Sequence, residues 1–274
     1  MSLNPEQLRV IFVDLDQCLL YRGNEDENYE LWEGESWLLL TVAFGADKEE
    51  HIKIYKEYRQ RINGSTENDQ KAHEILVEKL IKLWKDTWKN GPITRQTIEN
   101  ICEIFTRKIN SEALAVMGEF INRGILPIVG TGGLVDVARV VAQAIGAQKA
   151  VKNTDLAAVD MWFGNTSFIY DESGVLIGFD HKQNIVGTKK DQAIAKLNKI
   201  RDALGNQKIP IQTIAVGDGK SDIGLFMQYP GIAFRSTDED LIAESKGHAS
   251  SWAEVFSIAM LHFDQTPKID RSVA

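Results

Sequence analysis

The sequence is poor in cysteine and has no long apolar run. Only two cysteines, Cys18 and Cys102, occur among 274 residues, so there is no disulfide framework, and the composition is typical of a reducing compartment. No apolar stretch approaches the roughly 20 residues that a membrane-spanning helix needs, and the first residues lack the apolar segment of a signal peptide. These absences predict a cytoplasmic protein that does not enter a membrane.

Positive charge is also in short supply. The 31 lysines and arginines are outnumbered by 39 aspartates and glutamates, which gives a net charge of −8. That excess argues against nucleic acid or an anionic membrane surface as the main partner. An anionic small molecule would have to be attracted by a local arrangement of groups rather than by the field of the whole protein. No feature of the sequence indicates an oligomeric state.

Short apolar runs rich in β-branched residues predict four strands, at 10–13, 125–129, 211–216 and 232–234. The first three are followed by small or acidic residues and then by apolar residues at helical spacing, as in parallel strands joined by crossover helices. This pattern predicts an α/β core with a doubly wound parallel sheet, whose ligands bind at the carboxyl ends of the strands. The stretch "SFIYDESGVLIGFD" at 167–180 is predicted to form a β-hairpin.

About a hundred helix-rich residues separate the first two predicted strands. In "AHEILVEKLIKLWKDTW" the leucines and tryptophans recur at helical spacing, which indicates core packing, and "NGP" at 90–92 ends that helix. We therefore expect a helical cap domain over the strand tips. The predicted division is an α/β core at 1–20 and 118–265, the cap at 21–117 and a tail at 266–274.

Acidic and small residues follow the strands. Asp14 and Asp16 follow the first, "TGG" from Thr131 follows the second, and Asp218 and Asp222 lie in "GDGKSD" after the third. Each motif alone also fits a helix cap or a polar turn. Together they would crowd several carboxylates into one crevice, where like charges about 4 Å apart repel by roughly 4 kcal/mol at an effective dielectric near 20. A divalent cation removes that cost, and oxygen ligands beside a phosphate favour Mg²⁺.

Lys189 and Lys190 open the helix that follows Thr188. Cations in a first helical turn oppose the helix dipole. Either the two lysines form a solvated pair, or one of them reaches an anionic ligand as a point charge.

The order of these motifs resembles the haloacid dehalogenase (HAD) superfamily. Asp-x-Asp, Thr-Gly-Gly, a lysine at a helix start and Gly-Asp-Gly-x-x-Asp occur in that order between residue 8 and about residue 260. The phosphoserine-phosphatase-like subgroup, which has a helical cap after the first motif, is the most similar. The resemblance implies a Rossmann-like core and a Mg²⁺-dependent hydrolase of a small phosphorylated substrate.

The resemblance also implies roles for single residues. Asp14 would be the nucleophile that forms an aspartyl-phosphate, and Asp16 would be the general acid and base. Asp14, the carbonyl of Asp16 and Asp218 would bind Mg²⁺, with Asp222 as a further ligand or an orienting group. The phosphoryl oxygens would be held by Thr131, Gly132 and Lys190. Of the two adjacent lysines, Lys190 is the one favoured by the register of the family pattern.

The sequence departs from the family pattern at a few positions. Cys18 stands where Thr or Val is usual and is expected to be structural, and Ser221 replaces a commoner Asn. Glu35 falls about where phosphoserine phosphatases bind the amino group of their substrate, but Ile75 stands where they have an arginine for its carboxylate. Phosphoserine is therefore not specifically indicated.

Three functions remain open on this pattern. The first is a phosphomonoester hydrolase, and the second is a phosphotransferase or phosphomutase, which would use the same residues and differ only in the acceptor. The third is a catalytically inactive, metal-binding domain. The presence of both Asp14 and Asp16 argues against the third, because losing either one would disable catalysis without harming the fold.

Overall fold

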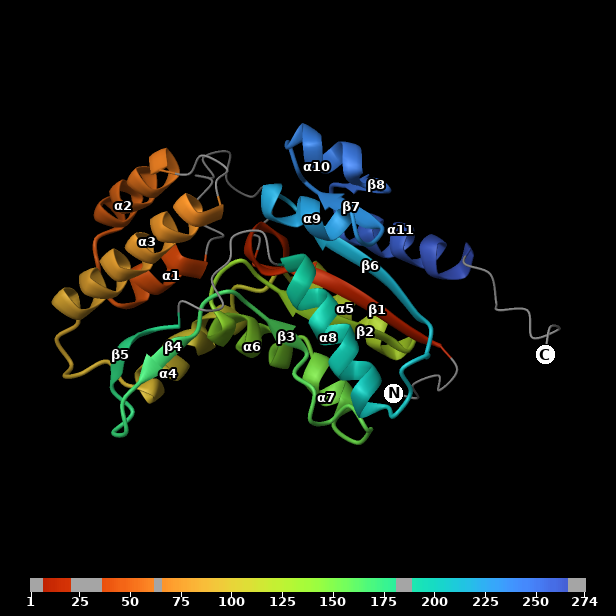
Figure 1. Ribbon diagram of the computed structural model, residues 1–274, viewed down its shortest axis with the longest axis horizontal. Helices are drawn as coiled ribbons and strands as arrows, with labels where there is room; N and C mark the ends of the chain where they lie inside the picture. Colours follow the sequence, from red (N-terminus) through yellow and green to blue (C-terminus); the bar gives the residue numbers. More distant parts are fainter. Residues whose placement is uncertain (1–6, 21–35, 62–65, 181–188, 266–274) are drawn as a thin grey trace.

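The computed structural model describes residues 7–20, 36–61, 66–180 and 189–265 (Figure 1). Its centre is a six-stranded parallel sheet of order β3-β2-β1-β6-β7-β8. The strands are β1 (Leu8–Asp14), β2 (Ile125–Gly130), β3 (Trp162–Phe163), β6 (Ile211–Gly217), β7 (Gly231–Phe234) and β8 (Gly247–Ala249). The four strands predicted from the sequence are β1, β2, β6 and β7, and this α/β architecture confirms the predicted fold class.

The central strands form where the chain is continuously apolar. All six residues of β2 are buried, and so are the last six residues of β6. Strands covered on both faces need such runs, because neither face meets water. The register pairs Val10 of β1 with Leu126 on one side and with Thr213 on the other.

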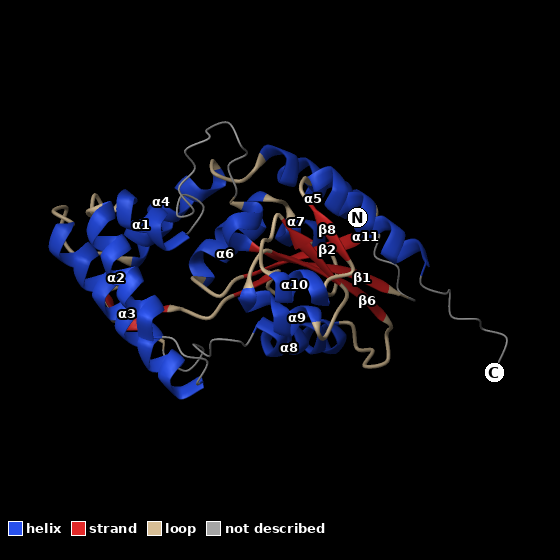
Figure 2. Ribbon diagram, turned by 90° about the horizontal axis from the view of Figure 1, so that it is seen from above, coloured by secondary structure: helices blue, strands red, loops and turns tan. Residues whose placement is uncertain are grey.

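Helices cover both faces of the sheet. Figure 2 shows α5 (Ser111–Asn122) and α11 (Trp252–Gln265) on one side and α8 (Lys189–Ala203) on the other. The remaining helices of this part are α6 (Val135–Ala144), α7 (Ala147–Val151), α9 (Ile223–Phe226) and α10 (Glu239–Glu244). The expected domain boundary at residue 118 falls within α5, which packs on β2 and α11.

Among the described residues between β1 and α5, four helices form what we call the helical insert: α1 (Ser36–Ala43), α2 (Lys48–Arg61), α3 (Thr66–Thr87) and α4 (Arg95–Thr106). Its core is aromatic. The ring of Trp84 is fully buried and stacks 6.0 Å from Trp37 and 5.1 Å from Phe44. The helical stripe on α3 is therefore core packing, as predicted.

The predicted hairpin is present as β4 (Phe168–Tyr170) and β5 (Leu176–Phe179), which pair antiparallel. The hairpin lies beside the helical insert (Figure 1). The backbone N–H of Leu176 donates to Ile93 at 2.8 Å, and that of Arg95 donates to Gly174 at 2.8 Å. Among the described residues, none of the helices combines the length and the apolar character that crossing a membrane would require.

Candidate active site

Asp14 ends the central strand β1 at the carboxyl edge of the sheet. It pairs in register with Gly130 of β2, and its carboxylate accepts a hydrogen bond from the backbone N–H of Leu15 at 2.8 Å. The chain then enters a tight turn, η1 (Leu15–Leu19), in which Asp16 is extended and Gln17 has a φ of +57°. That conformation is uncommon for a residue with a side chain. Asp14 is thus carried at the tip of the strand and is 93% buried, since its exposure is 7%.

Lys189, the first residue of α8, is the cation that meets Asp14. Its Nζ lies 2.8 Å from Oδ1 of Asp14 and 2.8 Å from Oδ1 of Asp222, and the side chain is buried. Burial alone would lower the pKa of Lys189, but the two carboxylates raise it above its usual range. Lys190 is half-buried and makes no ion pair or hydrogen bond within the described part of the chain. The geometry therefore favours Lys189, whereas the family register favoured Lys190.

Asp222 is folded back against the end of β6. Its Oδ2 accepts from the backbone N–H groups of Asp218 and Gly219 at 3.3 and 3.4 Å. The carboxylate fills the space beside Gly217, where an added Cβ would lie 2.3 Å from Cγ of Asp222. Burial, and then the charge of Asp14, raises the pKa of Asp222 to about 6.

Asp14, Cys18 and Asp218 form an acidic group that could hold a metal ion. One side-chain donor atom from each lies within 4.8 Å of the other two, and Sγ of Cys18 is 4.0 Å from Oδ1 of Asp218. Burial, and then the charges of Asp218 and Asp14, raises the pKa of the Cys18 thiol well above its usual value. The thiol therefore stays protonated and is a poor ligand, whereas the two carboxylates are the oxygen donors that a hard divalent cation prefers.

Charge balance at the site points the same way. Burial, and then the carboxylates of Asp14 and Asp222, raises the pKa of Asp218 well above its usual value. Lys189 is the cation paired with this group among the described residues, and it is already shared between two carboxylates. The donor set therefore fits a divalent cation between Asp14 and Asp218.

Asp16 faces a residue that the sequence reasoning missed. The backbone N–H of Ser36 donates to Oδ1 of Asp16 at 2.7 Å, and the Ser36 hydroxyl donates to Oδ2 at 3.2 Å. Ser36 is fully buried at the start of α1. Burial, and then the charge of Asp14, raises the pKa of Asp16 to about 7, and the bonds from Ser36 oppose that rise. The sequence gives little sign of this contact beyond a serine that directly precedes the apolar residues at 37–40.

The loop after β2 lies beside both Lys189 and the start of the insert. Thr131 is fully buried, and its Oγ1 accepts from the backbone N–H of Gly133 at 2.9 Å. A Cβ added at Gly132 would lie 3.9 Å from Cε of Lys189, and one added at Gly133 would lie 3.5 Å from Oγ of Ser36. The predicted residues of β1, β6 and the loop after β2 thus lie together with Lys189 of α8, and not with the predicted Lys190. Glu35 lies outside the described residues.

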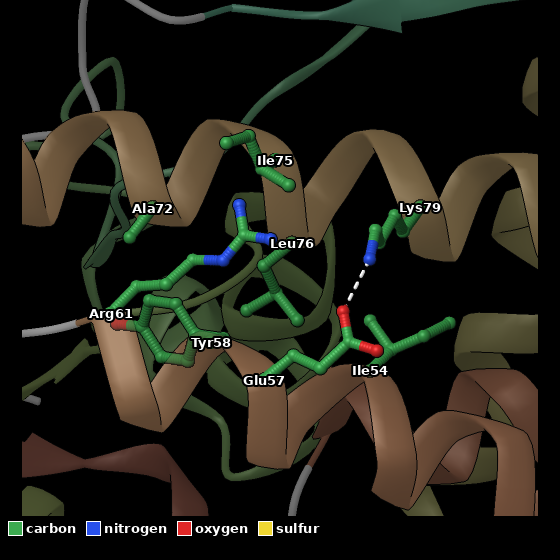
Figure 3. Close-up of a pocket in the computed structure, with 8 residues that line it drawn as sticks. All are labelled: Ile54, Glu57, Tyr58, Arg61, Ala72, Ile75, Leu76 and Lys79. Atoms are coloured by element: carbon green, nitrogen blue, oxygen red, sulfur yellow. Dashed lines mark hydrogen bonds and ion pairs between the residues drawn. The ribbon is translucent and has the colours of Figure 1, made fainter.

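A small cavity lies within the helical insert, between α2 and α3 (Figure 3). Its volume is about 10 Å³, which suffices for about one water molecule. Lys79 and Glu57 form an ion pair across it. The lining residues include Ile75, which stands where the sequence resemblance would place the arginine that phosphoserine phosphatases use for the substrate carboxylate. The cavity is too small to bind a metabolite.

No protein-family model matches the sequence, and no curated protein is similar enough to match it. Solved structures match over most of the chain. A phosphoserine phosphohydrolase-like protein from Francisella tularensis subsp. tularensis SCHU S4 has 18% identity and a TM-score of 0.58, over 92% of this chain and 99% of its own. A substrate-bound phosphoserine phosphatase has 20% identity and a TM-score of 0.54, over 91% and 97%.

A HAD family hydrolase from Salmonella enterica subsp. enterica serovar Typhi has 14% identity and a TM-score of 0.55, over 91% of this chain and 71% of its own. Identities this low show the fold and leave substrate and activity open. The resemblance stated from the motifs is confirmed at that level. The chain has the fold of phosphoserine phosphatases and HAD family hydrolases, with a six-stranded parallel sheet and a helical insert after the first strand.

Proposed function

We propose that the chain is a Mg²⁺-dependent phosphomonoester hydrolase that acts on a small phosphorylated metabolite through an aspartyl-phosphate. One observation carries this proposal. Carboxylate oxygens of Asp14 and Asp218 lie within 4.8 Å of each other, close enough to share one metal ion, and Nζ of Lys189 lies 2.8 Å from Oδ1 of Asp14. A nucleophile, a cation site and a fixed positive charge are the parts that phosphoryl transfer needs, because its catalysis is mainly positioning and neutralisation of charge.

Asp14 is the proposed nucleophile. Lys189 and the N–H of Leu15 hold its carboxylate in one orientation. A carboxylate oxygen attacks phosphorus, and the bond from phosphorus to the ester oxygen breaks. Asp16 gives its proton to the departing oxygen, then takes a proton from the water that hydrolyses the aspartyl-phosphate.

The phosphoryl group would be held by the loop after β2 and by Lys189. Thr131 Oγ1 accepts from Gly133 N–H, so its hydroxyl hydrogen is left to donate to a phosphoryl oxygen. Gly132 lies next to the Lys189 side chain and has no Cβ to block the approach of a phosphate to the backbone. We assign the phosphate-binding lysine to Lys189, because Lys190 has no contact with the strand-end carboxylates.

Asp14, Asp218 and the carbonyl of Asp16 would hold Mg²⁺, with Asp222 orienting the group from beside them. When bound, the ion supplies neutralisation of the carboxylates and of the charge on the phosphoryl oxygens. We retain the expectation that the cap region, including Glu35, selects the substrate, and that the chain acts within the cytoplasm.

The test is release of inorganic phosphate from p-nitrophenyl phosphate. We expect turnover with Mg²⁺, loss of turnover in EDTA and no turnover by Asp14→Asn. Asp155→Asn, at an exposed aspartate between α7 and β3, is the matched control and should retain full activity. Mass spectrometry of a quenched reaction should find the phosphoryl group on the peptide that contains Asp14.

Two results would contradict the proposal: turnover by Asp14→Asn, or turnover unchanged in EDTA. Adding an alcohol to the assay distinguishes a hydrolase from a transferase. A hydrolase that uses water alone should release one phosphate for each ester consumed. A transferase should release less phosphate than the ester consumed, because part of the phosphoryl group passes to the alcohol. A panel of phosphorylated metabolites then identifies the preferred substrate.

A further inference from the structure

The first residue of helix α1 in the helical insert, Ser36, contacts the carboxylate of Asp16, to which we assign acid catalysis. Ser36 supplies two donors, its backbone N–H and its hydroxyl, and each meets a different oxygen of Asp16, at 2.7 and 3.2 Å. A carboxylate bonded at both oxygens cannot rotate about its terminal bond without losing one of them. Ser36 is itself fully buried, so water does not compete freely for either contact.

The backbone around Asp16 gives little support of its own. Asp16 has an extended conformation, with φ −74° and ψ 140°, inside a turn where Gln17 is left-handed. No regular helix or strand therefore fixes the direction of the Asp16 side chain. A general acid must lie within hydrogen-bond reach of the departing oxygen, so its direction has to be set by a contact from elsewhere.

The position of Ser36 is set by how the helical insert rests on the loop after β2. A Cβ added at Gly133 would lie 3.2 Å from Nε1 of Trp37 and 3.5 Å from Oγ of Ser36. Helix α3 reaches the same region, because Nε2 of His73 lies 3.3 Å from Oγ1 of Thr166, whose backbone N–H donates to the carbonyl of Gly133 at 3.0 Å. The start of α1 thus lies beside the loop proposed to bind phosphate, and α3 is linked to that loop through Thr166.

We propose that Ser36 is a positioning residue for Asp16, through which the seating of the helical insert aims the acid at the departing oxygen. This inference rests on the proposed function. Seating of the insert and orientation of the acid are then coupled, because Ser36 bonds to Asp16 and also lies beside Gly133 of the loop. A simpler role for Ser36 is to start helix α1, with Asp16 satisfying a free N–H of the first turn. That role would affect stability but would not distinguish one leaving group from another.

The leaving group separates the two roles. Phenyl, p-nitrophenyl and dinitrophenyl phosphate have similar size, but their phenols are increasingly acidic and need less protonation as they depart. The ratio kcat/KM reports only steps up to formation of the aspartyl-phosphate, so hydrolysis of that intermediate does not enter. Ser36→Ala removes one donor, and Ser36→Pro removes both and suits the first position of a helix.

For Ser36→Ala we expect kcat/KM for phenyl phosphate to fall about 10-fold, a partial loss of acid catalysis. For Ser36→Pro we expect a fall of about 100-fold, the lower end of what acid catalysis contributes. For dinitrophenyl phosphate both variants should stay within about 2-fold of the wild type, because a good leaving group needs little acid. Ser36→Thr, which keeps both donors, should recover most of the loss. Thr41→Ala is the matched control: it removes the hydroxyl that Trp84 and His51 contact in the insert and should lower the melting temperature without changing the ratio between substrates.

Equal losses on all three esters, or none, in Ser36→Ala and Ser36→Pro would overturn the positioning role while leaving the phosphatase assignment intact. The same selective loss in Thr41→Ala would also overturn it, because a general loosening of the insert would then explain the effect. A wild type that cleaves none of the esters would overturn the proposed function and this inference together.

Discussion

Replacing Lys189 with methionine tests whether a buried cation holds the strand ends together. Each contact of Nζ with Asp14 and Asp222 is 2.8 Å long, which corresponds to roughly 6 kcal/mol of attraction at an effective dielectric of about 20. Burying the ammonium and the two carboxylates costs hydration energy that offsets much of this attraction. Removing only the ammonium leaves the carboxylates buried without their partner, which costs about 3–5 kcal/mol. We expect Lys189→Met to lower the free energy of unfolding by that amount.

Urea denaturation in EDTA, followed by far-ultraviolet circular dichroism, measures this loss. Lys190→Met is the matched control, because its half-buried side chain makes no ion pair among the described residues, and it should change stability by less than about 0.5 kcal/mol. Adding Asp222→Asn to Lys189→Met should recover at least about 1 kcal/mol relative to the sum of the single variants, since a buried charge is removed with its partner. Equal stability of the two lysine variants would refute the reasoning. In the phosphate assay, Lys189→Met should lose about 100-fold in kcat, and Lys190→Met should not.

Two further predictions concern single buried groups. Burial lowers the pKa of His51 to about 4, below its unfolded value of about 6.5, so the unfolded chain takes up the proton first. The stability contributed by neutral His51 is complete above pH ~6.5 and is lost as the pH falls through ~4, by up to roughly 3 kcal/mol. Urea midpoints measured from pH 7.5 to 4.5 should therefore fall less steeply in His51→Leu, and parallel curves would contradict the assigned pKa. Gly217→Ala should lower the free energy of unfolding by more than about 2 kcal/mol and abolish most activity, because its Cβ would lie 2.3 Å from Asp222. Gly219→Ala is the control, because a Cβ there meets nothing within 4 Å. Equal stability of the two alanine variants in urea would be evidence against that clash.

The sequence predicted those parts of the sheet that are buried on both faces. The runs at 10–13 and 211–216 lie within β1 and β6, because a fully buried parallel strand must be apolar throughout. Strands β3 and β8 were not predicted. They have two and three residues, too few for any periodicity, and they are defined by pairing with β2 and β7 rather than by their own composition.

Residue types at the site could be predicted, but their directions could not. Lys189 and Lys190 are adjacent in the first turn of α8, so their side chains leave the helix roughly 100° apart. Which of them faces Asp14 depends on how α8 packs on the sheet, and the local sequence carries no information on that packing. The contact between Ser36 and Asp16 spans 20 residues and has the same origin, because it depends on how the insert is seated.

The charge at the strand ends explains why these motifs must occur together. A chain with Asp14 and Lys189 alone would have one neutral pair at the tip of β1, which needs no further ion. Asp222 takes a share of the same ammonium, and Asp218 adds a carboxylate that has no ion pair among the described residues. Donor atoms of Asp14 and Asp218 lie within 4.8 Å of each other, and ionised carboxylates near 4 Å repel by roughly 4 kcal/mol at an effective dielectric near 20. Burial and this repulsion therefore keep the pKa of Asp218 raised. In the proposed enzyme a divalent cation would remove that repulsion, so the carboxylate that is costly to ionise without metal is also the one that would strengthen metal binding.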